Sequence, residues 1–357
     1  MNRIAQIINS AQLEDNDALV IFNEVNVTYL SGFTGHAATL LITKHATVLI
    51  TDYRYVEQAE AEVDGIKVLC RYRQEHSLGE LLDIVLNEHN IKQLYFESDH
   101  ISAHQWQVLA AELSVQKTIP SVGLTESLRY TKTPQEVDLI RQAAHIADDA
   151  LAMVLNDIRE GVTERELTTE LEYQMAKLGS QEISFQTILL FGARAAMPHG
   201  VPGNRRLCHG DFILIDFGAV VQGYHSDMTR TYVFGKADEK QKMVYDTVLK
   251  AQLAAIEAVE VGVSGEFVHQ QAENILCQSP FAEYRSKGLG HGLGMDVHEQ
   301  PFMMPGCDQK LDNGYVVTIE PGIYIPGWGG VRIEDDVALM DNQLQILNKT
   351  AKDQFEL

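Results

Sequence analysis

The segment that most constrains the fold is residues 211–230, DFILIDFGAVVQGYHSDMTR, an apolar run with one aspartate inside it. Its middle predicts a two-residue hairpin turn at Gln222 and Gly223, because glycine adopts a positive φ at little cost. In that register Asp216 and Asp227 are diagonal neighbours on one face, roughly 7 Å apart or less at Cβ. A carboxylate in an apolar strand must be paired or bound to metal. The hairpin therefore predicts that Asp216 and Asp227 bind one ion together. The alternative is that one aspartate caps a loop and the other lies on the surface.

Three segments further along the chain carry more groups that could bind metal. Residues 288–299, GLGHGLGMDVHE, place His291 and His298 in a glycine-rich setting. Glu320 ends an expected strand, and Arg332 and Glu334 share one face of another, because strand side chains alternate. Two aspartates, two glutamates and one histidine form a carboxylate-rich set that suits manganese or zinc. Such a set is large enough for two ions roughly 3.5–4 Å apart, as in two-metal hydrolases.

A nucleotide site is the competing interpretation of the glycine-rich run. The dinucleotide pattern G-x-G-x-x-G, begun at Gly288, would need glycine where this chain has Leu293, and no helix pattern follows. We therefore expect these glycines to let the backbone approach the metal centre closely.

These motifs resemble those of the pita-bread metallopeptidases, which include aminopeptidase P, prolidase and methionine aminopeptidase. The resemblance runs from about Thr133 to the end of the chain, and the segment before it resembles the extra domain of the proline-specific members. The matching C-terminal residues are Pro198-His199-Gly200, Asp216, Asp227, His291, His298, Glu320-Pro321-Gly322 and Arg332-Ile333-Glu334, and the matching N-terminal motifs are Tyr29-Leu-Ser-Gly-Phe-Thr-Gly35 and Thr51-Asp-Tyr-Arg-Tyr55.

The resemblance implies a dinuclear metal centre and assigns a role to each matching residue. The implied ions are two divalent cations per subunit, Mn²⁺ first, with Zn²⁺ or Co²⁺ as alternatives. The implied ligands are Asp216, Asp227, His291, Glu320 and Glu334. The implied catalytic residues are Glu320 as general base, His199 and His298 as donors to the substrate carbonyl, and Arg332 as support either for Asp216 or for the residues around the ligands. The alternative for the two histidines is a loop and a strand histidine with no role.

The resemblance also indicates the substrate. The N-terminal motifs favour an Xaa-Pro aminopeptidase, which removes the residue before a proline. A prolidase, which cleaves only Xaa-Pro dipeptides, is the close alternative, and a non-catalytic pita-bread binding module is a third. We also expect a homodimer.

Lys287 departs from the family pattern, because proline-specific relatives often have histidine four residues before the metal histidine. It is either a solvent-facing lysine or a cation facing the cleft, where it could attract a substrate carboxylate.

The amino-acid composition argues against some classes of binding partner and indicates the cell compartment. The chain has 28 Lys and Arg residues against 50 Asp and Glu residues, a net charge of −22, which argues against nucleic acid or an anionic membrane as a partner. The four cysteines form no C-x-x-C pair, so we expect free thiols in a reducing compartment. The N-terminal residues do not resemble a signal peptide, and no apolar run approaches the length of a membrane span. We expect a cytoplasmic protein that acts on proline-containing peptides.

The length of 357 residues suits two domains. We expect residues 1–125 to form a creatinase/prolidase-like α/β domain with a mixed sheet. Residues 126–357 are expected to form an α+β catalytic domain with a curved antiparallel sheet, which the resemblance identifies as the pita-bread fold. Helix-opening capping boxes are predicted at Ser77, Thr133 and Thr163, with a further cap at Ser102.

Overall fold

The computed structural model describes residues 3–357. It divides into two compact units, Met1–Arg129 and Tyr130–Leu357. The boundary expected after residue 125 lies inside α6 (Leu124–Arg129), with which the first unit ends. In residues 3–357, no helix is both long and apolar enough to cross a membrane.

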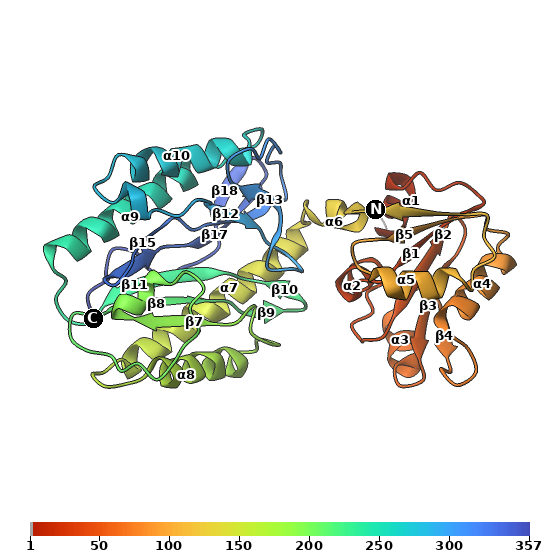
Figure 1. Ribbon diagram of the computed structural model, residues 1–357, viewed down its shortest axis with the longest axis horizontal. Coiled ribbons are helices and arrows are strands. Elements are labelled where there is room, and N and C mark those ends of the chain that lie inside the picture. The colour runs from red at the N-terminus through yellow and green to blue at the C-terminus, as the bar shows by residue number, and fades with distance from the viewer. Residues whose placement is uncertain (1–2) are drawn as a thin grey trace. The chain divides into compact units, whose positions relative to one another are not determined.

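The first unit is built on a mixed sheet with the strand order β4-β3-β2-β1-β5-β6 (Figure 1). The β1–β2 and β2–β3 pairs are antiparallel, and the β3–β4, β1–β5 and β5–β6 pairs are parallel. The strands are β1 (Asp17–Ile21), β2 (Thr39–Thr43), β3 (Thr47–Asp52), β4 (Lys67–Arg71), β5 (Gln93–Glu97) and β6 (Lys117–Ser121). The helices are α1 (Arg3–Ser10), α2 (Glu24–Ser31), α3 (Val56–Glu62), α4 (Leu78–Glu88), α5 (Ala103–Ala110) and α6. The predicted α/β class and mixed sheet are confirmed.

The second unit is an α+β structure in which all the ladders between strands are antiparallel in the described residues. Its larger sheets have the orders β11-β8-β7 and β13-β12-β14-β17-β18, and the pairs β9–β10 and β15–β16 complete it. The strands are β7 (Ile188–Phe191), β8 (Phe212–Phe217), β9 (Val220–Val221), β10 (Tyr224–His225), β11 (Met228–Val233), β12 (Gly290–Gly292), β13 (Glu299–Met303), β14 (Val316–Ile319), β15 (Gly322–Ile325), β16 (Gly329–Arg332), β17 (Asp335–Met340) and β18 (Gln343–Ile346).

Two helix pairs cover the strands of the second unit. They are α7 (Pro134–Val154) with α8 (Glu164–Lys177), and α9 (Glu239–Glu257) with α10 (Gly265–Cys277). The first pair shares an apolar core with one face of β7, β8 and β11, and the second packs on the other strands and on the opposite face of β8. Figure 1 shows α9 and α10 above the strands and α8 below them. The antiparallel α+β class and the pita-bread fold are confirmed.

The helix starts follow the predicted capping chemistry. Ser77, Ser102, Thr133 and Thr163 each accept a hydrogen bond from the third helical N–H, and the residue at that position returns one. Helix α7 stops at Val154 and continues as a short 3₁₀ turn, a tightening that is common at helix ends. The sequence analysis missed α1, α2, β4, β6 and α6.

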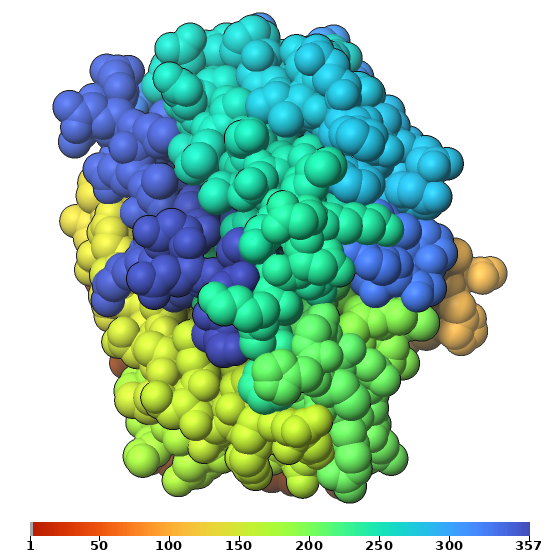
Figure 2. Space-filling view, turned by 90° about the vertical axis from the view of Figure 1, so that its left-hand side faces the viewer, coloured from red at the N-terminus to blue at the C-terminus, as the bar shows by residue number. Residues whose placement is uncertain are grey.

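The end of the chain lies against β11 and α9. Phe355 accepts a hydrogen bond from the Val233 N–H with its carbonyl, and its ring stacks on Tyr245 at 4.0 Å. Figure 2 shows this dark-blue segment beside the green segment that leads into α9. Lys352, on the same segment, forms an ion pair with buried Asp335, the neighbour of Glu334 in the chain. The C-terminal segment therefore supports the strands that hold the candidate ligands.

Candidate metal centre

The hairpin between β8 and β11 has the predicted turn and register. Gln222 and Gly223 both have positive φ, 49° and 77°, as a two-residue turn of this kind requires. Asp216 pairs with Thr229, and Asp227 lies two positions before Thr229 on the same strand face. The two aspartates are therefore diagonal neighbours, as the sequence predicts.

The expected ligands converge from β8 and β12 and from the short segments directly beside other strands of the second unit. Glu334, which was expected on one strand with Arg332, lies between β16 and β17. Asp227, His291 and Glu334 form the tightest group, with one potential ligand atom from each within 4.8 Å of the others. The Nε2 atom of His291 lies 3.7 Å from a carboxylate oxygen of Asp227 and 3.4 Å from one of Glu320. The carboxylate of Asp216 faces the same cavity. The structure thus brings together all the residues that the sequence nominates as ligands.

The ring of His291 is oriented for metal binding. Its Nδ1 lies 3.0 Å from the carbonyl oxygen of Gly292 and donates to it, which leaves the Nε2 lone pair facing the carboxylates. The His291 backbone N–H donates to the Thr318 hydroxyl at 3.2 Å, which fixes the strand beside it. Burial lowers the pKa of His291 to about 4, so the imidazole is neutral, the form that binds metals.

The buried carboxylates repel one another and lack partners for some of their oxygens, so they are suited to binding a cation. Asp216, Asp227 and Glu334 each keep one buried oxygen that has no hydrogen-bond partner among the described residues. Burial, together with the charges of neighbouring carboxylates, raises the pKa of both Asp227 and Glu334 well above the ordinary values. Buried, unpartnered and mutually repelling oxygens are costly unless a positive ion neutralises them. The donor set therefore fits divalent metal ions.

A network of hydrogen bonds orients the carboxylates of the candidate ligands. The hydroxyl of Thr229 donates to Glu334 at 2.6 Å and accepts from Nε of Arg332 at 3.0 Å. Arg332 also donates to the Tyr324 hydroxyl at 2.7 Å and forms an ion pair with Asp216. One buried guanidinium therefore contacts Asp216 directly and reaches Glu334 through the Thr229 hydroxyl.

Sequence reasoning missed several of the supporting residues. Thr229 lies two positions after Asp227, and Asp336 lies two positions after Glu334 and accepts the Asp227 N–H at 3.0 Å. A polar residue two positions from a ligand shares its strand face, and this spacing was the signal available in the sequence. Tyr324 had no such signal, because only the β15–β16 pairing brings it to Arg332.

The ligands lie at the base of a cavity of about 760 Å³. His199 and His298 line it as exposed side chains, in contrast to the buried His291. The rings of His291 and His298 are 4.4 Å apart at their centroids. Burial, with the nearby His199, lowers the pKa of His298, which keeps a neutral imidazole that can donate one N–H. The two histidines therefore face the space in which a substrate would bind.

Lys287 also lines this cavity, as an exposed side chain. Of the cations that line it in residues 3–357, Arg285 is paired with Glu273 and Arg332 with Asp216. Lys287 has no carboxylate within ion-pair distance among these residues. The structure thus places Lys287 on the cleft, where its charge is available to a ligand.

The glycines near His291 serve strand packing. A Cβ atom at Gly290 would lie 2.0 Å from the Thr318 carbonyl oxygen, and one at Gly292 would lie 2.3 Å from that of Gln300. The close approach at these two glycines is therefore to the backbone of the neighbouring strands β14 and β13, and the expected approach to the metal centre stays a prediction.

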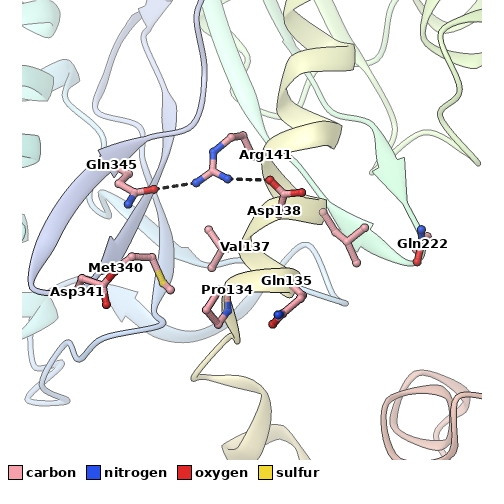
Figure 3. A pocket seen from close by; sticks show the side chains of 10 residues that line it. Pro134, Gln135, Val137, Asp138, Arg141, Gln222, Met340, Asp341 and Gln345 are labelled. Carbon is pink, nitrogen blue, oxygen red and sulfur yellow. Dashed lines mark hydrogen bonds and ion pairs between the residues drawn. The ribbon is translucent and has the colours of Figure 1, made fainter.

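A second cavity, of about 630 Å³, lies where α7 begins, beside β17, β18 and the turn at Gln222 (Figure 3). Arg141 spans part of it and donates to Asp138 at 3.0 Å and to Gln345 at 2.8 Å. Its lining combines these paired polar groups with Pro134, Val137 and Met340. Among residues 3–357, no group of potential metal ligands like that of the first cavity lies in it. We therefore place the candidate site in the first cavity.

An antiparallel α+β unit that gathers carboxylates and one imidazole at the base of a cavity defines a metal-dependent hydrolase. Residues 138–341 match Metallopeptidase family M24, and residues 3–131 match the Creatinase/Prolidase N-terminal domain. This chain belongs to metallopeptidase family M24 and is a metal-dependent exopeptidase.

Relatives of full length support this assignment. The uncharacterized peptidase YqhT of Bacillus subtilis is 34% identical over 339 residues, which cover 94% of this chain and 95% of that protein. The solved structure of an Xaa-Pro dipeptidase from Bacillus anthracis has a TM-score of 0.94 at 35% identity and covers 99% of this chain and 98% of its own. The X-Pro aminopeptidase from Thermotoga maritima has a TM-score of 0.91 at 33% identity, with 98% and 100% covered. Both activities therefore occur among close structural neighbours.

Proposed function

We propose that this protein is a dinuclear Xaa-Pro aminopeptidase, which hydrolyses the bond between an N-terminal residue and a following proline. The observation that carries the proposal is the convergence of Asp216, Asp227, His291, Glu320 and Glu334, three of which keep a buried oxygen without a partner. A set of this size and charge supports two cations rather than one.

The chain's own residues have separate tasks in this proposal. When bound, the two ions lower the pKa of a water molecule and so supply a nucleophile near neutral pH. Glu320 is proposed to take up the proton of that water, because its carboxylate lines the cavity and lies 3.4 Å from Nε2 of His291 among the candidate ligands. His199 and His298 donate to the carbonyl oxygen of the scissile bond and stabilise the charge that develops there. Arg332 keeps Asp216 and Glu334 in position.

The size of the cavity supports an aminopeptidase. Its volume of about 760 Å³ lies in the upper part of the roughly 300–1,000 Å³ range of pockets that hold drug-sized ligands. It therefore has room for residues beyond the proline. A prolidase is the second candidate, and the observation that favours it is Lys287, whose unpaired charge could bind the free carboxylate of a dipeptide.

We further propose Mn²⁺ as the metal and a homodimer as the assembly. Four carboxylates and one imidazole form an oxygen-rich set, which suits Mn²⁺ and tolerates Zn²⁺ or Co²⁺. Reconstitution of the metal-free protein with each ion in turn tests the metal, and sedimentation equilibrium tests the dimer.

Two measurements test the proposed function. Elemental analysis of the purified protein should give two divalent ions per chain; one ion or none would contradict a dinuclear centre. Steady-state kinetics should then compare an Xaa-Pro dipeptide, an Xaa-Pro-Xaa tripeptide and an Xaa-Ala-Xaa tripeptide. An aminopeptidase cleaves both proline peptides and a prolidase only the dipeptide, whereas equal cleavage of the alanine peptide would refute proline specificity.

A further inference from the structure

A buried ion pair joins the start of α7 to the strand that follows His298. The Nζ atom of Lys132 lies 2.8 Å from Oε2 of Glu299, and the two side chains are only 3% and 5% exposed. The residues are 167 positions apart in the chain. Removing two charges from water is costly, and such a pair persists only where its geometry is good.

The ion pair is adjacent in the chain to His298, a residue that lines the cavity. Glu299 is the first residue of β13 and follows His298, which lies in the bend before that strand. The His298 side chain lines the cavity, whereas the Glu299 side chain is buried against Lys132. The other carboxylate oxygen of Glu299 accepts the backbone N–H of Asp296 at 3.1 Å. The pair thus holds both ends of the short segment that carries His298.

The first turn of α7, which begins two residues after Lys132, also contacts the hairpin that carries Asp216 and Asp227. Glu136 accepts a hydrogen bond from the Tyr224 hydroxyl at 2.5 Å, and Tyr224 lies three residues before Asp227. The His225 N–H donates to the Gly294 carbonyl oxygen at 2.8 Å, which ties the hairpin to the segment before His298. Figure 3 shows that Pro134 and Gln135 face the second cavity; Glu136, between these and the rest of the helix, is buried.

We infer that Lys132 and Glu299 are positioning residues for His298. Their ion pair fixes residues 294–299 against α7 and so sets the position of the imidazole relative to the bound ions and the substrate carbonyl. A shift of about 1 Å in such a donor can cost on the order of 10²-fold in rate. The inference rests on the proposed function in one respect, the contact of His298 with the substrate.

The test is a double-mutant cycle in the metal-loaded, full-length protein. The variants are Glu299→Gln, His298→Ala and the combination of both. Glu299→Gln keeps the shape and one acceptor oxygen but removes the ion pair. We expect it to lower kcat about 10–100-fold with KM and metal content unchanged. In the His298→Ala background, the same change should lower kcat by less than about twofold, because its effect acts through the imidazole.

Two outcomes of the cycle distinguish a wrong role for His298 from a wrong positioning role for the ion pair. If His298→Ala leaves kcat unchanged, the proposed role of His298 is wrong. If His298→Ala lowers kcat but Glu299→Gln lowers it further by its full factor, His298 keeps its role and the positioning inference is overturned.

Further variants separate positioning from folding. Lys132→Met removes the cation beside the buried Glu299 carboxylate and should lower the melting temperature, whereas Lys132→Met with Glu299→Gln should recover most of it because neither charge remains. The recovered double variant should still have low kcat and faster amide hydrogen exchange at residues 294–298. Wild-type kcat or unchanged exchange in that folded variant overturns the inference. Asp211→Asn, which breaks the ion pair with Arg205 elsewhere in this unit, is the control and should leave kcat and this exchange unchanged.

Discussion

The Thr229 hydroxyl donates to the Glu334 carboxylate at 2.6 Å, across 105 positions of the chain, and accepts from Arg332 at 3.0 Å. Thr229→Val keeps the shape and removes both contacts. Because the partners that orient a ligand affect metal affinity, we expect affinity to fall about 10–100-fold while the fold is kept. Isothermal titration of the metal-free protein measures this. Thr231→Val is the control, because that hydroxyl bonds to the backbone of Arg332 and to no ligand; equal losses in both variants would contradict the prediction.

Asp227→Asn should abolish activity. The change keeps the size of the side chain but removes a negative charge from a buried group that we propose as a ligand of the two-metal centre. We expect at least one metal ion per chain to be lost, measured by elemental analysis, and turnover to fall to background. A variant with full metal content and near-normal turnover would refute the proposed ligand set.

His298→Ala should keep the metal and lose turnover. The side chain lines the cavity and belongs to the exposed group rather than to the buried ligands. Loss of one donor to a developing oxyanion lowers kcat by about 10²–10³-fold. Metal content serves as the control measurement. Unchanged kcat would mean that the histidine is only structural.

Lys287→Met should affect substrates according to their charge. The lysine is the cavity cation without a carboxylate partner in the described part of the chain. A charge-assisted hydrogen bond contributes about 1.5–3 kcal/mol, so kcat/KM for an Xaa-Pro dipeptide should fall roughly tenfold or more relative to a C-terminally amidated tripeptide. Lys310→Met, on a residue that does not line this cavity, is the control. Equal effects on both substrates, or no effect on either, would make Lys287 a surface residue.

Metal removal should change how stability depends on pH. Without metal, burial raises the pKa of Asp227 and Glu334 well above the ordinary values and that of Glu320 to about 7. Between the ordinary pKa near 4 and about 7, the folded metal-free protein therefore binds more protons than the unfolded chain, so its stability falls as pH rises. Calorimetry should show a melting temperature that decreases from pH 5 to pH 7.5 after chelation, relative to the metal-loaded protein. Parallel curves for the two forms would contradict this assignment.

The local chemistry of the site could be predicted from the sequence because short segments carry it. The turn at Gln222 and Gly223 and the face shared by Asp216 and Asp227 depend only on strand alternation and on residues that tolerate positive φ. Helix starts such as Thr133 followed local capping rules in the same way. Weakly amphipathic or short elements such as α2 and β6 were missed, because their positions depend on packing rather than on local pattern.

The sequence by itself determined which side chains could bind metal, since the residue types and their strand spacing are properties of each segment. Only the tertiary structure decided how those segments meet. The contacts between Thr229 and Glu334 and between Lys132 and Glu299 join residues more than a hundred positions apart, and no periodicity within one segment encodes such a pairing. These contacts form because burial of the strands' apolar faces against α7–α10 brings the polar edges together, where each buried charge then needs a partner.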